Sequence, residues 1–321
     1  MQKGICIRFK YSGKFCSLIK RNGGNQMEKR VKLLVIAGGG VFGAIPARFL
    51  MEAEDLYNTH EITHLAGTSI GGIEALYLAT GKTPTALYED FCKAAPEIFK
   101  PKLIKRIFPL WKGSTYDSKN IERFLRRCIP GKMGDLSRKV IVPAINFKLE
   151  IPKIFHNLEG SVDMRYDAWK VGRATSAAPT YFDPYGQDIL IDGGIVENIP
   201  LMTSIATLKA TEKVKLEDMD VFIIGTGSPD VDANKTLKSV SNYWPWQWAT
   251  KMLLPFVTKA NEIASEHWGQ NMGFHYFKYY NPIVIDGKMD NAKLVTSGYL
   301  DDCCDSRIGE FRLEFIKFLE A

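Results

Sequence analysis

Two short apolar runs, each ending in a glycine-rich turn that leads into a helical pattern, constrain this chain more than any other feature. The run VKLLVIA at 31–37 precedes the turn GGGVFG, and the run ITHLA at 62–66 precedes the turn GTSIGG. Apolar runs bounded by glycine are typical of buried strands, and strands that alternate with helices form a mostly parallel sheet. The sequence therefore predicts an α/β protein in which these two turns lie side by side at one edge of the sheet.

The same alternation continues along most of the chain. Further strands are predicted at 140–147, 153–156, 188–191 and 221–227. Helices are predicted from the first glycine turn to about Tyr57, at 70–80, 84–98, 116–128 and 166–177, after Pro200, and at the end of the chain, where Ile308, Phe311, Phe315 and Phe318 share one face. Because no internal repeat is present, these elements favour one sheet covered by helices.

The start of the chain differs in charge from the rest. Residues 1–30 hold eight Lys and Arg against the single acid Glu28, whereas the remainder holds 34 basic and 35 acidic side chains. A nearly neutral remainder argues against a nucleic-acid surface. We predict a basic, disordered arm at 1–26, with a membrane-touching arm as the alternative, followed by a single domain at 27–321.

The cysteines and the hydropathy limit the cellular setting. The six cysteines form no CxxC pair, and the adjacent Cys303 and Cys304 lack the spaced partners of a zinc site. We therefore expect reduced thiols, a cytoplasmic location and no metal ion. No run of 18 apolar residues is present, so the sequence predicts no membrane span.

Two segments mix features that suit a lipid surface with features of ordinary packing. Segment 99–112 carries five Lys or Arg residues and no acid among Leu, Ile, Phe and Trp, which fits either a lid on an anionic bilayer or a solvated loop over the core. The tryptophan-rich segment 243–248 is typical of membrane interfaces. A packed corner or a contact between subunits is the interpretation we favour for it.

The second turn has the sequence of a nucleophile elbow. Gly67-Thr68-Ser69-Ile70-Gly71 lies between a predicted strand and a predicted helix, which is the context that G-x-S-x-G requires. Gly67 and Gly71 permit the crowded turn that exposes a hydroxyl at the helix N-terminus. Ser69 is therefore the predicted nucleophile.

The first turn fits two anion-binding sites. Read as Gly38-x-Gly40-x-x-Gly43, it matches the dinucleotide fingerprint, and a glycine-rich backbone can equally hold the oxyanion formed when an ester is attacked. A dinucleotide fold requires an acid near the end of the second strand, and no acid follows Glu61 there. We therefore favour an oxyanion hole that uses the amides of Gly39 and Gly40.

The base that would activate Ser69 is less obvious from local patterns. None of the five histidines lies in a glycine-bracketed turn; they are His60, His64, His156, His267 and His275. Asp192 ends a short apolar strand and is followed by Gly193 and Gly194, so its carboxylate would emerge at a strand terminus. Two alternatives stay open: a Ser-His-Asp esterase that uses His267 or His275, and a nucleotide-binding module built on the Gly38–Gly43 loop.

Four blocks of sequence together resemble the patatin-like phospholipase family: GGGVFG, GTSIGG, ATSAAPTYF at 174–182 and DGGIVENIP at 192–200. The resemblance covers about 31–227. It implies a three-layer α/β/α sandwich in which Ser69 and Asp192 form a catalytic dyad without histidine. It also implies an oxyanion hole made of the amides of Gly38, Gly39 and Gly40, with no metal or other cofactor.

The resemblance implies a function as well. Family members hydrolyse acyl esters of glycerolipids, so the expected partner is a phospholipid at a membrane surface that the protein contacts peripherally. Some bacterial relatives are activated by cyclic nucleotides, which makes a nucleotide activator a further expectation, together with a homo-oligomer. The chain departs from the family pattern at Ala37, Phe42 and Ile199; at Phe42 the family commonly has a cation.

Overall fold

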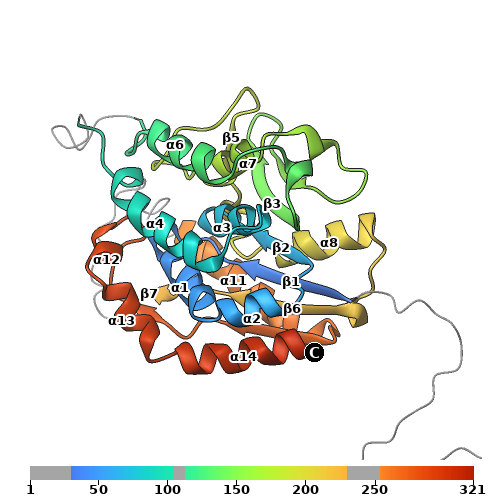
Figure 1. Ribbon diagram of the computed structural model, residues 1–321. Helices are drawn as coiled ribbons and strands as arrows, with labels where there is room; N and C mark the ends of the chain where they lie inside the picture. The colour runs from blue at the N-terminus through green and yellow to red at the C-terminus, as the bar shows by residue number, and fades with distance from the viewer. Residues whose placement is uncertain (1–29, 104–112, 230–253) are drawn as a thin grey trace, which may run out of the picture.

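The computed structural model describes residues 30–103, 113–229 and 254–321. Within them, seven strands form one sheet in the order β4-β3-β2-β1-β6-β8, with β5 added beside β3 (Figure 1). These strands are β1 (Val31–Ile36), β2 (His64–Gly67), β3 (Lys139–Asn146), β4 (Ile151–His156), β5 (Leu190–Asp192), β6 (Met219–Ile224) and β8 (Tyr276–Tyr280). A separate pair consists of β7 (Ser228–Pro229) and β9 (Val284–Ile285).

The sheet is mostly parallel, as predicted. β1 pairs in parallel with β2 and β6, β2 pairs in parallel with β3, and β6 pairs in parallel with β8. β4 and β5 run antiparallel to β3. The carboxyl ends of the parallel strands consequently meet at one edge of the sheet, where α/β proteins place their functional loops.

Helices cover both faces of the sheet. The α-helices are α1 (Ala44–Glu52), α2 (Glu54–Thr59), α3 (Ile70–Ala79), α4 (Pro84–Ile98), α6 (Ser118–Cys128), α7 (Ala168–Thr175), α8 (Leu201–Thr211), α11 (Leu254–Asn271), α12 (Lys293–Thr296), α13 (Tyr299–Asp305) and α14 (Ile308–Glu320). Short 3-10 helices are η1 (Gly40–Gly43), η2 (Met133–Asp135), η3 (Val162–Arg165), η4 (Gly193–Ile195) and η5 (Leu216–Asp218).

The alternation of side chains along β1 explains the three layers. Leu34 and Ile36 belong to the core that the sheet shares with α1, α3, α4 and α14, whereas Leu33 and Val35 pack with α8 on the opposite face. α11 lies on the α8 face as well, because Gly269 lies directly against the ring of Phe277 in β8. The predicted three-layer α/β/α sandwich is therefore confirmed.

Most predicted elements are present with small shifts at their ends. The helix expected from the first glycine turn to Tyr57 is interrupted, because Ala53 leaves the helical region with φ −115° and ψ 22°. The strand expected at 188–191 begins two residues later, since Ile189 has a left-handed φ of 51°. The predicted arm at 1–26, most of segment 99–112 and all of segment 243–248 lie outside the described residues.

The apolar face predicted for the last helix is part of the main core. Phe311, Phe315 and Phe318 of α14 are fully buried, and their rings lie 5.4–5.9 Å from the ring of Phe222 in β6. Ile308 at the start of the helix is only half-buried. None of the helices in the described ranges combines the length and apolar character needed to cross a bilayer.

Candidate active site

Ser69 lies between the end of β2 and the start of α3 in a strained backbone conformation. Its φ is 56° and its ψ is −124°, a region that residues with a side chain rarely adopt. The Ser69 amide donates a hydrogen bond to Oγ1 of Thr175 at 3.0 Å. This is the geometry of a nucleophile elbow, and it holds the hydroxyl at the N-terminus of a ten-residue helix.

The glycines around this turn are required by close backbone contacts. A Cβ atom on Gly67 would lie 2.1 Å from the carbonyl oxygen of Gly71, and one on Gly71 would lie 2.2 Å from that of Ile36. Gly193, after the predicted base, faces the carbonyl oxygen of Pro143 in the same way at 2.6 Å. Each of these backbone atoms is held in a strand or helix, so a side chain could fit only if the site moved.

The pairing of β5 brings Asp192 to the serine across 123 positions of sequence. β2 pairs with β3 only as far as Ala66 opposite Ile141, and β5 pairs with the continuation of β3, placing Asp192 opposite Ala144. The Ser69 hydroxyl donates a hydrogen bond to Oδ2 of Asp192 at 2.6 Å. The Gly194 amide donates to the other carboxylate oxygen at 2.7 Å.

The surroundings of Asp192 change its acidity. Burial raises the pKa of its carboxyl group to about 6, against the opposing effect of the hydrogen bonds from Ser69 and Gly194. A carboxylate with this pKa accepts a proton far more readily near neutral pH than an aspartate in water. The site therefore joins a hydroxyl to a group with the properties of a general base.

The first glycine turn lies beside the serine. A Cβ atom on Gly38 would be 3.3 Å from Cβ of Ser69. The amide of Gly38 donates to the carbonyl oxygen of Asn198 at 3.1 Å, which corrects the expectation that all three glycines offer free amides. No described residue accepts a hydrogen bond from the amides of Gly39 and Gly40, and Gly40 has a left-handed φ of 60°.

The histidines do not complete a triad with these residues. The carboxylate of Asp192 bonds directly to Ser69 and Gly194, so no imidazole separates the acid from the serine. His275 bonds to Asp220 at the start of β6, at the sheet edge opposite the elbow. His267 is exposed on α11, with its backbone carbonyl bonded to Asn271. The geometry contradicts the Ser-His-Asp alternative.

Several polar residues of the site were not singled out by the sequence analysis. Thr175 Oγ1 accepts from Ser69 and donates to the carbonyl oxygen of Pro143 at 2.7 Å. Asn198 Nδ2 and Thr226 Oγ1 both donate to the carbonyl oxygen of Gly38, at 3.2 and 2.8 Å. Thr175 and Asn198 lie within the ATSAAPTYF and DGGIVENIP blocks, so the family resemblance contained the signal that could have identified them.

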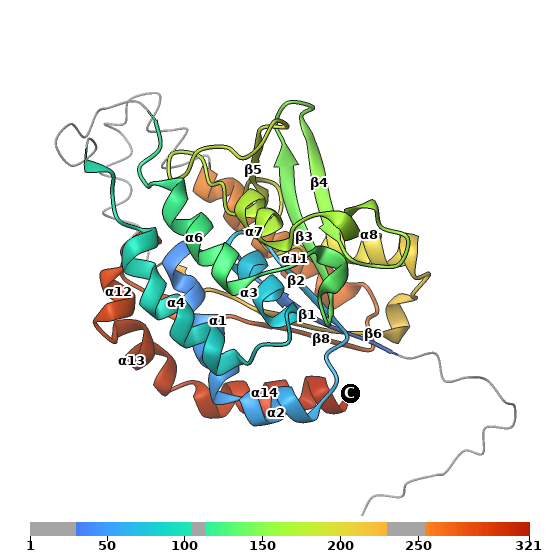
Figure 2. The ribbon, with the colours of Figure 1, turned by 45° about the horizontal axis from the view of Figure 1, so that its top comes forward.

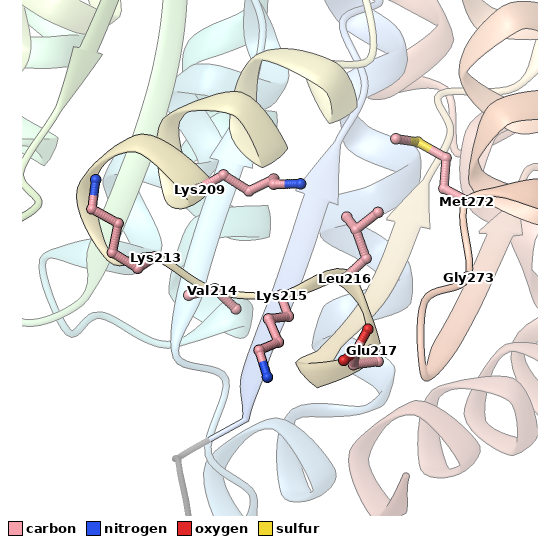
Figure 3. A pocket seen from close by; sticks show the side chains of 8 residues that line it. All are labelled: Lys209, Lys213, Val214, Lys215, Leu216, Glu217, Met272 and Gly273. Atoms are coloured by element: carbon pink, nitrogen blue, oxygen red, sulfur yellow. The ribbon is translucent and has the colours of Figure 1, made fainter.

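Two open pockets of the described residues lie away from this pair. One of about 510 Å³, between the C-terminal end of α8 and the residues after α11, is lined by Lys209, Lys213, Lys215 and a single acid, Glu217 (Figure 3). A neighbouring cavity shares Lys213 and Lys215 and reaches Arg30 at the start of β1. Both cavities therefore occupy the sheet edge opposite Ser69.

Comparison with known proteins agrees with the geometry. The family model described as patatin-like phospholipase matches residues 34–205, which include both Ser69 and Asp192. The chain belongs to the patatin-like phospholipase family. Family membership favours the oxyanion interpretation of the Gly38–Gly43 loop over a nucleotide-binding module.

Curated relatives give the range of similarity. A cGAMP-activated phospholipase of Vibrio cholerae is 31% identical over 231 residues, which cover 62% of this chain and 65% of the relative. A protein of the same name from Escherichia coli is 30% identical over 271 residues, covering 76% and 75%. Patatin-like protein 2 of Arabidopsis thaliana is 28% identical over 272 residues, covering 68% and 65%. The chain thus spans just under two thirds of the Vibrio relative's length.

Proposed function

We propose that this protein is a serine phospholipase that cleaves acyl esters of glycerophospholipids through Ser69, Asp192 and an acyl-serine intermediate. The observation that carries the proposal is the 2.6 Å hydrogen bond from the Ser69 hydroxyl to a buried carboxylate at the elbow. Membership of the patatin-like phospholipase family supports the ester of a phospholipid as the substrate.

The reaction follows from the two side chains. The Ser69 oxygen attacks the ester carbonyl carbon while its proton passes to Asp192. The tetrahedral intermediate collapses, the carbon–oxygen bond to glycerol breaks, and the departing glycerol oxygen takes the proton from Asp192. Water then attacks the acyl-serine with Asp192 as base, which releases the fatty acid and restores the Ser69 hydroxyl.

The amides of Gly39 and Gly40 are the proposed donors to the tetrahedral oxyanion. They adjoin the serine through Gly38 and have no acceptor among the described residues. A preorganised donor of this kind contributes on the order of 3 kcal/mol to the stability of the transition state. The N-terminus of α3 adds a favourable dipole at Ser69. At the position of Phe42 the family commonly has a cation. In this chain, these backbone groups supply the positive potential instead.

Mass spectrometry of phospholipid vesicles tests the proposal. The wild-type protein should release fatty acid and lysophospholipid, whereas Ser69→Ala and Asp192→Asn should each lower the rate by at least about a thousandfold. Glu159→Gln is the matched control, because Glu159 is an exposed carboxylate after β4, at the sheet edge opposite Ser69. A fluorophosphonate probe should label the wild type but not Ser69→Ala. Equal release of fatty acid by all four proteins would refute the assignment.

Activation by a cyclic dinucleotide is proposed as the regulation of this enzyme. Two relatives, 30% and 31% identical, are named cGAMP-activated phospholipases. The lysine-lined cavity of Figure 3 is the proposed site for the phosphates, because no described carboxylate forms an ion pair with Lys209 or Lys215. Adding cGAMP should raise the vesicle hydrolysis rate, and Lys209→Gln with Lys215→Gln should weaken its binding. An unchanged rate with cGAMP would contradict this regulation.

A further inference from the structure

The turn between β3 and β4 exposes apolar side chains at the same sheet edge as Ser69. Phe147, Leu149 and Ile151 are 58%, 61% and 50% exposed, and Ile189 beside them is also exposed. Figure 2 shows the β3–β4 hairpin extending beyond the neighbouring elements. A cluster of exposed large apolar side chains on an ordered element is typical of an interaction surface.

The tip is held in place by its own hydrogen bonds. The side-chain oxygen of Asn146 accepts from the Leu149 amide at 3.0 Å, and the Phe147 amide donates to the carbonyl oxygen of Ile189 at 3.2 Å. Ile189 has a φ of 51°, which is unfavourable for a β-branched residue. The backbone is therefore fixed in a form that keeps these apolar side chains in water.

The position of the tip relative to the dyad indicates what covers it. Asp192 lies opposite Ala144 on β3, so the dyad is level with that residue. Phe147 is three residues further along, which corresponds to about 10 Å at the rise of a β-strand. Apolar groups of peripheral proteins enter the boundary between headgroups and acyl chains by about 5–10 Å. Insertion of the tip by that amount would bring Ser69 to the level of the headgroups and ester bonds.

We propose that Phe147, Leu149, Ile151 and Ile189, the hairpin patch, insert into the phospholipid bilayer and present Ser69 to the ester bonds. The proposal rests on the proposed phospholipase function. The patch includes one lysine, Lys148, and one glutamate, Glu150, in its turn. Since Asp188 also lies beside Ile189, the surface around the patch has no excess of positive charge, so a zwitterionic bilayer is a sufficient surface and the apolar contact supplies the affinity.

The test measures binding separately from catalysis. Ser69→Ala protein, with and without the pair Phe147→Ser and Leu149→Ser, is sedimented with phosphatidylcholine vesicles. We expect the pair to lower vesicle affinity at least tenfold, since two large apolar contacts are lost. Phe147→Trp should bind at least as tightly as phenylalanine, because tryptophan favours the membrane interface. Unchanged melting temperatures would show that the variants fold normally.

A matched control lies at the other end of the same hairpin. Val162 follows β4 at the opposite sheet edge and is 86% exposed, so Val162→Ser should leave vesicle binding unchanged. We call the protein with both Phe147→Ser and Leu149→Ser the tip variant. With Ser69 intact, the ratio of vesicle hydrolysis to hydrolysis of a water-soluble short-chain ester should fall at least tenfold in the tip variant and stay constant in Val162→Ser.

The outcomes separate the surface from the chemistry. Wild-type hydrolysis together with normal vesicle binding by the tip variant would overturn the hairpin patch but keep the phospholipase. If the wild type releases no fatty acid but the tip variant still loses vesicle binding, the hairpin patch stands as a membrane surface and the proposed phospholipase reaction is refuted. If the tip substitutions dissociate an oligomer and leave vesicle affinity unchanged, the patch contacts a second copy of the chain and the proposal is wrong.

Discussion

The carboxyl group of Asp192 has its unusual acidity only because the fold removes it from water. Its pKa of about 6 predicts that hydrolysis of a soluble ester rises with pH through about 6 and then levels off, since only the carboxylate accepts the serine proton. A pH profile of kcat/KM for the wild type measures this directly. A profile that is flat between about pH 4.5 and 8 would show that another group is the base.

The burial of Asp192 also predicts that replacing it removes activity but increases the stability of the fold. A folded-state pKa raised from 3.8 to about 6 means that ionisation of Asp192 destabilises the fold as pH rises through this range. Asp192→Asn should therefore abolish hydrolysis yet raise the free energy of unfolding at pH 8, by up to about 3 kcal/mol. The gain should vanish below about pH 4, where urea titration should give equal stabilities; a loss of stability at pH 8 would contradict the prediction.

Glu74 of α3 is a second buried carboxyl, which the proposed mechanism does not use. Neither of its side-chain oxygens has a hydrogen-bond partner in the described residues, and burial raises its pKa well above the usual value. Glu74→Leu should raise the free energy of unfolding at pH 8 by about 1–3 kcal/mol, and by less at pH 4, as measured by urea titration. Glu89→Gln on the exposed face of α4 is the control. If Glu74→Leu lowers the stability instead, the Glu74 carboxyl group must have a hydrogen-bond partner outside the described residues.

At the scale of elements, α7 positions the elbow. Its last residue, Thr175, joins the Ser69 amide to the carbonyl oxygen of Pro143 in β3. Thr175→Val keeps the shape but removes both hydrogen bonds, so kcat on a soluble ester should fall about tenfold to a hundredfold with a smaller change in KM. Thr175→Ser should restore most of the rate. If valine and serine variants behave alike, the hydroxyl has no positioning role.

Helices and strands were predicted well where local residues, such as proline or a capping threonine, restrict the backbone conformation. α4 begins at Pro84 and ends at Ile98 as expected, because proline favours the first turn and Thr83 caps it. Burial along β1 and β6 follows from their apolar runs, which are interrupted at Lys32 and Asp220, two side chains that form an ion pair with each other. The strand before Asp192 begins two residues later than predicted. The left-handed Ile189 accepts a hydrogen bond from the Phe147 amide just after β3, a contact that no local sequence pattern contains.

At the scale of the whole molecule, α14 closes the larger core. Phe315 is fully buried between Phe222 and Phe311, at ring distances of 5.4 and 5.3 Å. Phe315→Ala should lower the free energy of unfolding by about 3–5 kcal/mol, whereas Leu313→Ala, on the exposed face of the same helix, should change it by less than about 0.5 kcal/mol. Urea titration should show one transition for 27–321; two transitions would contradict the prediction of a single domain.

The sequence by itself determined the strands, the two glycine turns and the serine at the elbow, because apolar periodicity and crowded backbone act over a few neighbouring residues. It left the partner of that serine open until the family resemblance named Asp192. Only the tertiary structure decided that the Asp192 carboxylate accepts a hydrogen bond from Ser69 and that the Gly38 amide donates to the Asn198 carbonyl oxygen. It also decided that apolar side chains are exposed to solvent at the hairpin tip. The dyad and the hairpin tip depend on how β3 pairs with β2, β4 and β5, and the Gly38–Asn198 contact likewise joins residues far apart in the chain.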